Sequence, residues 1–329
     1  MPIRRRTLLQ TTAFAPLLAI LATRAQAQAA PFETLKVVTG FPPGGTSDTI
    51  CRRVAAKIPA GYAKTAVVEN RTGAGGQIAI QALKQLPNDG SVILQTPASM
   101  LTLQPHLFPR EVRYDAATDL AAVSTVCTFP FALAVPAAHP AQDFAGLVAW
   151  LRAQSAEVPF ASPATGSAPH FLGIMLGQAV GARLTHVPYR GAVPAIQDLL
   201  GGRLPMFVGV LGDISPHVGS GARMLAVSSP TRHPRHPSVP TFAELGHAAL
   251  NKQEWFGAFV PAGTPAASVA ALHAAYRAAA AAPELVAALD RLDFTPGISE
   301  SPAAFAAQVL QDRTEWAEIV KASGFRPEA

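Results

Sequence analysis

The chain has 329 residues, with 26 lysines and arginines against 21 acidic residues, a formal net charge of +5 and a pI of about 9.5. At roughly 100 to 200 residues per domain, this length predicts two domains with sizeable cores and excludes a disulfide-stapled miniprotein. With 49% apolar and 14% charged residues, the composition excludes intrinsic disorder. After residue 30, lysines and arginines do not cluster with aromatic residues, so the sequence does not indicate a nucleic-acid surface.

The first 27 residues have the pattern of a secretory signal peptide. Three arginines at 4–6 precede the apolar stretch 13–22, and A-Q-A at 25–27 matches a small-residue cleavage site. An apolar core of about ten residues is too short for a membrane anchor, which needs roughly twenty. We therefore predict export, and because R-R-T-L-L at 5–9 loosely matches a twin-arginine signal, the general secretory and twin-arginine routes both stay open.

Removal of this segment changes the charge argument. The segment carries four arginines and no acidic residue, so the mature chain keeps 22 basic against 21 acidic residues and is nearly neutral. The overall charge therefore gives no support for a nucleic-acid partner, and any affinity for acids must come from local donors.

Short β-like runs alternate with helical patterns along the mature chain, which predicts mainly parallel sheets with helical crossovers. Two such series predict two lobes. The first series has strand 35–39, helix 48–58, strand 66–69, helix 76–85 and strand 92–95. After residues 121–128, the second has strand 131–135, helices 143–154 and 167–180, strand 186–188, helix 193–200 and strands 206–210 and 224–227.

The C-terminal part of the sequence differs in kind. A strand over 255–260 precedes two long alanine-rich helices, which Thr264-Pro265 and Ser301-Pro302 open with a capping residue and a proline at the first helical position. This tail is expected to pack back on the first lobe. The proline-rich segment 228–240 is predicted to be an ordered surface loop.

The two cysteines could form a disulfide, and one pair of histidines could bind a metal. Cys51 and Cys127 are the only cysteines, and buried free thiols are favoured over a disulfide. His233 and His236 each have a proline beside them, and their segment contains no Cys, Asp or Glu, which disfavours a metal. We expect neither a metal nor a cofactor.

Four predicted strand-to-helix turns, at 41–48, 69–76, 164–170 and 186–192, are rich in glycine and small polar residues. Such turns lie at the carboxyl ends of strands, where open α/β sheets bind ligands, and free amides at a helix N-terminus favour an anion. Tight turns alone would explain any one of them. Four turns divided between two lobes favour a site for a small carboxylate, with Arg71 and Arg190 as the only cations in them.

Individual residues in and near these turns keep two interpretations. Asp48 either caps its helix, which is favoured, or also bonds a ligand donor. His170 is either a ligand donor or a solvent-facing residue of the first helical turn, and Tyr189 either lines the cleft with its hydroxyl or packs against neighbours. Trp255 and Phe256 begin an apolar strand, where core packing is favoured over ligand stacking.

The four turns resemble those of the periplasmic solute receptors of tripartite tricarboxylate transporters, also called Bug proteins. The resemblance runs in order from about Leu35 to the C-terminus. It is carried by F-P-P-G-G at 41–45 with Asp48, E-N-R at 69–71, G-A-G-G at 73–76, G-S at 166–167 with His170, H-V-P-Y-R-G at 186–191, D-L-L-G-G at 198–202, V-P-T-F-A-E-L-G at 239–246, W-F-G at 255–257 and P-A-G-T-P at 261–265.

The resemblance implies an α/β, two-lobed type II periplasmic-binding-protein fold. Each lobe would be a mainly parallel sheet flanked by helices, with lobe 1 over 31–129 plus 258–329 and lobe 2 over 130–257. In the family, the ligand carboxylate is held by the first Gly-Gly turn and by the start of the helix after the second turn, and the other lobe adds the Ser/His and Tyr turns. The expected ligand-binding residues are Gly44, Gly45, Thr46, Ser47, Asp48, Gly75, Gly76, Thr165, Ser167, His170 and Tyr189.

Three functions follow from the sequence. The favoured one is a monomeric periplasmic receptor that delivers a small organic acid to the membrane permease subunits of a tripartite tricarboxylate transporter. A second is a ligand sensor that signals to a membrane protein. The third, an exported enzyme with His170 or Asp48 as general acid/base, is disfavoured because Glu69 is the only other carboxylate in the four turns and none holds a cysteine.

Overall fold

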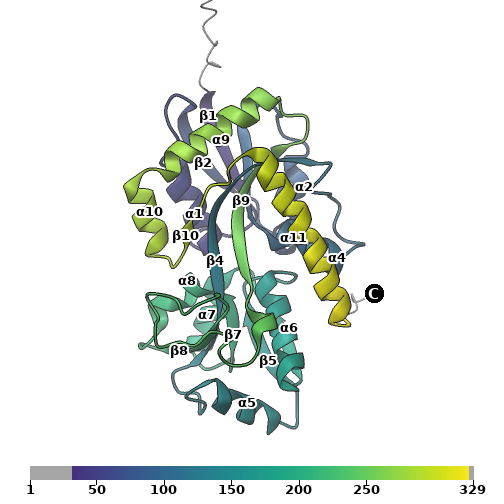
Figure 1. Cartoon of the computed structure of the whole chain (residues 1–329), viewed down its shortest axis with the longest axis vertical. Helices are drawn as coiled ribbons and strands as arrows, with labels where there is room; N and C mark the ends of the chain where they lie inside the picture. The colour runs from purple at the N-terminus through teal and green to yellow at the C-terminus, as the bar shows by residue number, and fades with distance from the viewer. Residues whose placement is uncertain (1–31, 326–329) are drawn as a thin grey trace, which may run out of the picture. The chain divides into compact units, whose positions relative to one another are not determined.

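The structure, a computed structural model, describes residues 32–325, in which strands and helices alternate through an α/β fold (Figure 1). The predicted signal peptide, residues 1–27, lies outside the described residues. Among the helices that are described, none is both long and apolar enough to cross a membrane. The strands are β1 (Phe32–Thr39), β2 (Ala63–Asn70), β3 (Val92–Pro97), β4 (Leu120–Pro136), β5 (Val158–Ser162), β6 (Leu184–Pro188), β7 (Phe207–Val210), β8 (Ala222–Val227), β9 (Gln253–Pro261) and β10 (Thr295–Pro296).

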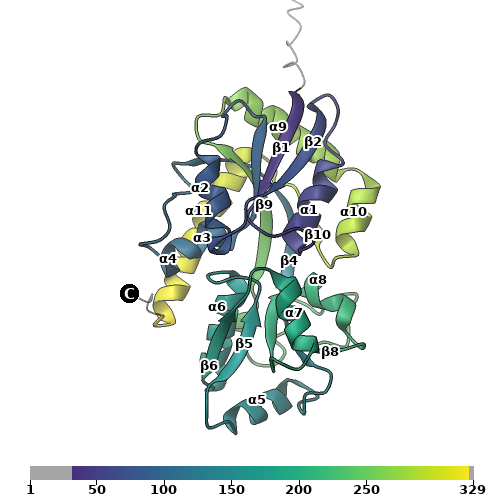
Figure 2. The ribbon, with the colours of Figure 1, turned by 180° about the vertical axis from the view of Figure 1, so that it is seen from behind.

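Helices fill most connections between these strands (Figures 1 and 2). The α-helices are α1 (Thr46–Ala55), α2 (Gln77–Leu83), α3 (Ser99–Thr102), α4 (Gln104–Leu107), α5 (Phe144–Arg152), α6 (Ala168–Val180), α7 (Ala192–Leu200), α8 (Leu211–Ile214), α9 (Ala266–Ala280), α10 (Pro283–Asp290) and α11 (Pro302–Ala322). Three short 3-10 helices are η1 (Ala74–Gly76), η2 (Ser215–His217) and η3 (Ala248–Leu250).

One mixed sheet connects the ten described strands in the order β2-β1-β3-β9-β4-β7-β5-β6, and β8 and β10 each pair with β4. The outer strands pair in parallel, β1 with β2 and β3, and β5 with β6 and β7. The central strands pair antiparallel, β9 with β3 and β4, and β4 with β7 and β8. The parallel regions therefore lie on either side of an antiparallel centre.

β4 is a single 17-residue strand that runs through the antiparallel centre between the two parallel regions (Figure 1). Its first part, up to Pro130, pairs with β9, and from Phe131 onward it pairs with β7 and β8. The sequence predicts a separate strand over 131–135, because a proline inside an apolar run argues against one continuous strand. The structure corrects this prediction: Pro130 stands where the pairing partners change.

The sequence missed the two-residue strand β10 and the longer strand β5. β5 contains Pro159, which lacks a backbone N–H and lowers the expectation of a strand in the middle of a sheet. Even so, β5 pairs with β6 over its whole length and meets β7 at Ala161.

The sequence predicts N-cap residues at Asp143, Thr264 and Ser301, and the structure confirms two of them. The Asp143 side chain accepts a hydrogen bond from Gly146 N at 2.7 Å and caps α5, and Ser301 accepts one from Ala304 N at 3.1 Å and caps α11. The prediction for Thr264 was wrong. Its hydroxyl instead donates to Pro261 O at 2.7 Å within the preceding turn, and α9 begins after Pro265 without a side-chain cap.

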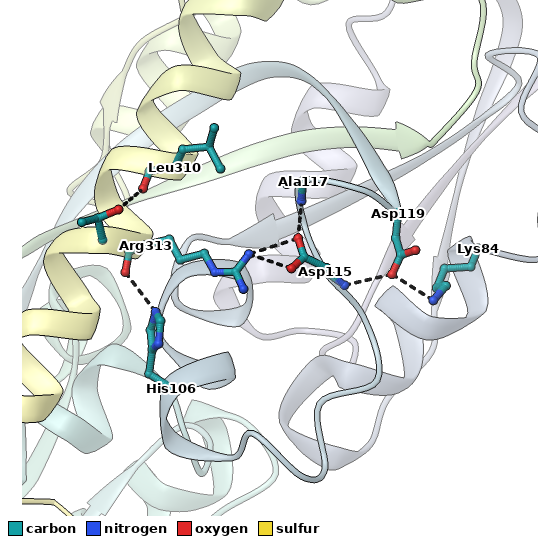
Figure 3. A network of polar contacts seen from close by, with 8 residues as sticks. Lys84, His106, Asp115, Ala117, Asp119, Leu310 and Arg313 are labelled. Atoms are coloured by element: carbon teal, nitrogen blue, oxygen red, sulfur yellow. Dashed lines mark hydrogen bonds and ion pairs between the residues drawn. The ribbon is translucent and has the colours of Figure 1, made fainter.

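The C-terminal helix returns to the N-terminal part of the fold, where α11 packs against α3 and β4. Figure 3 shows the polar contacts that hold it: Arg313 Nη1 donates to both carboxylate oxygens of Asp115 at 3.0 Å, and the His106 ring lies 2.9 Å from Arg313 O. Asp115 N in turn donates to Asp119, whose carboxylate pairs with Lys84 at 2.9 Å. The loop before β4 is thereby bonded to helices from both ends of the chain.

Both cysteines are buried and unpaired, as favoured from the sequence. Burial raises the pKa of the Cys51 and Cys127 thiols well above the ordinary range. Neither thiol therefore carries the thiolate character that a reactive cysteine needs.

The cap of α5 gives a direct stability prediction. Asp143→Ala should lower the free energy of unfolding by about 1 kcal/mol, because an N-cap side chain satisfies an otherwise unpaired amide. Asp143→Asn should retain most of the stability, since asparagine caps equally well. Urea unfolding of the two variants beside the parent checks this, and an equal loss in both would contradict the capping role.

Candidate ligand-binding site

Two adjoining pockets open where the turns after β1, β2, β5 and β6 meet. The first pocket has a volume of about 290 Å³ and the second about 890 Å³. Both are bordered by the same six residues: Phe41, Pro42, Pro163, Ala164, Arg190 and Gly191. The four turns singled out in the sequence therefore do converge on one region.

The first turn places the start of α1 in the first pocket, which Gly45, Thr46 and Ser47 line. Gly45 is the N-cap residue of α1 and offers no side chain to the free amides of the first helical turn. Uncapped amides and the positive end of the helix dipole together favour an anion at this point. Gly44, with φ of 83°, makes the turn possible but does not line either pocket.

Asp48 is committed to structure rather than to either pocket. Its side chain is 4% exposed and accepts from Gly44 N at 3.0 Å, from Arg52 Nε at 2.9 Å and from Asn70 Nδ2 at 2.8 Å. The bond back to Gly44 resembles the reach of a third-position acid in a capping box, so the capping interpretation is the one the contacts match. Burial alone would raise the pKa of Asp48, but the hydrogen bonds from Arg52, Gly44 and Asn70 outweigh burial and lower the pKa.

The second turn lines the second pocket with Gly75 and Gly76. Both have positive φ angles, 61° and 98°, which glycine adopts without strain. Neighbouring backbone also leaves no room for a side chain at Gly75, since a Cβ there would lie 2.8 Å from Thr165 O. The second turn therefore lies directly against the third.

The third turn divides its polar residues. Ser167 lines the first pocket and caps α6, accepting from His170 N at 3.4 Å and donating to Ala164 O at 2.7 Å, while Thr165 lines the second pocket. His170 lies behind them, outside both pockets; its Nδ1 accepts from Gly166 N at 3.1 Å and its ring lies 3.9 Å from that of His186. Burial, reinforced by His186, lowers the pKa of His170 to about 3, so the ring is neutral.

The fourth turn brings Tyr189 to the second pocket and Arg190 to both. The Tyr189 hydroxyl donates to Asp198 at 2.6 Å, which orients the ring. Burial, together with this carboxylate, raises the pKa of Tyr189 to about 12. Arg190 is exposed and is the only cationic side chain among the residues that line the two pockets.

Two acidic residues in the first pocket were missed from the sequence. Asp213, on α8, accepts a hydrogen bond from Thr46 Oγ1, and Glu254, on β9, accepts one from Ser99 N. Burial raises the pKa of both carboxyl groups to about 7. Neither lies in one of the four glycine-rich turns; the available signal was an acid next to an apolar segment, D in V-G-V-L-G-D-I and E directly before W-F-G.

The aromatic pair at the start of β9 is split between two environments. Trp255 packs against Phe305 and Phe259, with ring centroids 4.9 and 6.0 Å apart. Phe256, although buried, lines the first pocket. Core packing therefore holds for Trp255, whereas Phe256 has access to a ligand.

The histidine pair of the loop 228–240 gains an acidic neighbour from outside its segment. Asp293 lies 3.7 Å from His233 and 3.5 Å from His236, and the potential metal-binding atoms lie within 4.8 Å of one another. The sequence argument against a metal was therefore incomplete. Arg235 Nε, however, lies 3.4 Å from the same carboxylate and already supplies a positive charge there.

Comparison with known proteins identifies the family. Residues 50–325 match the family described as tripartite tricarboxylate transporter family receptor. The chain belongs to this receptor family. Protein BugT of Bordetella pertussis is 31% identical over 298 residues, 89% of this chain and 90% of BugT. Both the resemblance found in the sequence and the α/β periplasmic-binding-protein fold are thereby confirmed.

Solved structures of similar proteins agree with this assignment. Rpa4515 of R. palustris, solved with adipate, is 28% identical and superposes with a TM-score of 0.84 over 90% of this chain and 98% of that one. MatC from Rhodopseudomonas palustris, solved with bound malate, is 25% identical with a TM-score of 0.81 over 87% of this chain and 98% of that one. The two bound ligands, adipate and malate, are dicarboxylates.

The contacts of Asp48 lead to a pH-dependent prediction. Because its pKa is lowered in the folded state, its carboxylate stabilises the fold above its ordinary pKa of 3.8, and that contribution disappears as the pH falls through the lowered value. Asp48→Asn should therefore cost roughly 1–3 kcal/mol at pH 7 and progressively less below about pH 4. Denaturant unfolding at several pH values measures this.

The exposed acid Glu284 provides the control, since Glu284→Gln should leave stability nearly unchanged at pH 7. A loss in Asp48→Asn that does not vary with pH would contradict the electrostatic explanation.

Proposed function

We propose that this receptor captures a small organic carboxylate in the two pockets and delivers it to a tripartite tricarboxylate transporter. The observation that carries the proposal is the uncapped N-terminus of α1, which presents Gly45, Thr46 and Ser47 to the first pocket. Free amides there suit a carboxylate. Carboxylates bound to the related Rpa4515 and MatC proteins support this choice of ligand class.

Other donors around the pockets complete the proposed site. The Ser167 hydroxyl and the Arg190 guanidinium border the first pocket, and Gly75, Gly76, Thr165 and Tyr189 border the second. We propose these residues as ligand contacts, with Gly44 and Asp48 shaping the first turn and His170 supporting the third. The position of Asp48 and His170 outside both pockets also argues against a role for either as general acid/base.

We further propose that binding couples to closure of two lobes, 31–129 plus 258–329 and 130–257. Both would move about β4 and β9, the strands that pass between the parallel regions. A ligand that contacts turns from both lobes stabilises the closed arrangement by its differential affinity for it. The hydrogen bond from Thr46 to Asp213, and the lack of room for a side chain at Gly75 beside Thr165, support such an arrangement.

The proposal includes location and partners. Residues 1–27 are proposed to direct the chain to the periplasm, where it acts as a monomer and meets the membrane permease subunits. The four arginines of this segment then play no part in binding.

Ligand binding should raise the stability of the mature protein. A carboxylate at a hundredfold excess over its dissociation constant adds about 2.7 kcal/mol to the free energy of unfolding. A thermal-shift panel of mono-, di- and aromatic carboxylates, with mass spectrometry of copurifying molecules, measures this. The absence of both a shift and a bound acid across the panel would refute the proposed function.

The role of Arg190 can be tested with a matched pair of arginines. Arg190→Gln should weaken binding of the best acid about 10- to 100-fold, the worth of a charge-assisted hydrogen bond. Arg71→Gln is the control, because Arg71 pairs with Glu69 and lines neither pocket. Isothermal titration calorimetry measures the affinity of both variants for this acid. Equal affinities would show that Arg190 is not part of the site.

Transport is tested separately from binding. A deletion strain should lose uptake of the labelled acid and regain it with the intact gene. Unchanged uptake combined with a lost transcriptional response would favour the sensor instead.

A further inference from the structure

Two acidic residues line the first pocket from different elements, Asp213 from α8 and Glu254 from β9. Each is anchored through one oxygen, since Thr46 Oγ1 donates to Asp213 Oδ1 and Ser99 N donates to Glu254 Oε1. Within residues 32–325, no hydrogen bond is made to the second oxygen of either group. Each side chain is therefore held in place with one acceptor atom left over.

The remainder of the first pocket does little to balance two negative charges. Its walls include the apolar side chains of Phe41, Pro97, Met100, Phe129, Val210 and Phe256. The one cation among its lining residues is Arg190, which is exposed. On the far side of Glu254, Asp312 of α11 contributes further negative charge.

We infer that Asp213 and Glu254 select a carboxylic acid that also carries N–H donors, an ammonium or a primary amide, over a dicarboxylate. The inference rests on the proposed function, because the start of α1 must hold the carboxylate of the same ligand. Thr46 belongs to that helix start and also bonds Asp213, so the anionic and the acidic parts of the pocket adjoin.

The physical reason is the cost of unpaired charge in an apolar pocket. A second ligand carboxylate would face two acidic groups and would bind only if both stayed protonated. N–H donors would instead pair with the two free oxygens and stabilise the ionised carboxylates. Burial raises the pKa of both groups to about 7, and no cationic side chain among the described residues offsets that rise.

Four-carbon acids with different end groups test the selectivity. Succinate carries a second carboxylate, succinamate a primary amide, butyrate no polar end, and 2-, 3- and 4-aminobutyrate an ammonium at increasing distance from the carboxylate. By calorimetry at pH 8, an amide or amino acid of this set should bind at least about tenfold more tightly than succinate and butyrate, a difference of about 1.4 kcal/mol.

The pH dependence has opposite signs for the two ligand classes. An ammonium favours ionised Asp213 and Glu254, so its affinity should rise between pH 6 and pH 8 and its binding should release protons. Succinate should bind more weakly over the same range, because the pocket becomes more negative. Titration in buffers of different ionisation enthalpy measures the released protons.

Amide variants isolate the charge from the shape of the pocket. Asp213→Asn and Glu254→Gln keep an oxygen to accept from Thr46 and Ser99, and should reduce the preference over succinate about tenfold each and flatten the pH dependence. Thermal melting should show no loss of stability, since each change removes a poorly paired carboxyl group. Glu157→Gln, on an exposed acid outside both pockets, should preserve selectivity.

The outcomes separate this inference from the receptor function. Succinate binding as tightly as the best amide or amino acid, or a preference that persists when both acids are replaced, would overturn the inference and leave the receptor intact. If no acid of this set or of the wider carboxylate panel binds, the proposed function itself fails.

Discussion

The arrangement of the molecule depends on one long strand that changes partners along its length. β4 pairs with β9 up to Pro130 and with β7 and β8 beyond it, so this one strand links the two parallel regions. Because the carboxyl ends of β1, β2, β5 and β6 are all fixed relative to these central strands, four turns distant in sequence meet at two adjoining pockets. The antiparallel centre thus sets which loops a ligand can touch at once.

The four turns differ in the pocket that they line. The first and third begin helices in the first pocket, and the second and fourth line the second pocket with Gly75, Gly76 and Tyr189. Asp48, for which the family resemblance implies a ligand contact, accepts hydrogen bonds from Gly44, Arg52 and Asn70. The first turn, which we propose as an anion site, is therefore held in shape by a buried carboxylate of the protein itself.

Sequence patterns were sufficient for the family, the alternation of strands and helices, and the four turns, because glycine and capping residues act locally. They were insufficient where distant segments meet. Asp213 and Glu254 lie outside the four glycine-rich turns, and only the folded sheet brings them beside Thr46 and Ser99. Likewise, Asp293 joins His233 and His236 from a separate segment. Pro130 lies inside β4 and Pro159 inside β5, and prolines at these positions argued against a continuous β4 and against any β5.

The two cysteines give the molecule a property that neither a disulfide nor a surface thiol would. Cys51 lies on α1, beside the first ligand turn, and Cys127 lies on the strand that joins the parallel regions, and both are fully buried. A thiol reagent can reach them only when the surrounding core opens. The rate of thiol modification therefore measures, without any mutation, how often the core opens. A decrease in that rate on addition of a ligand measures how far the ligand stabilises the folded core.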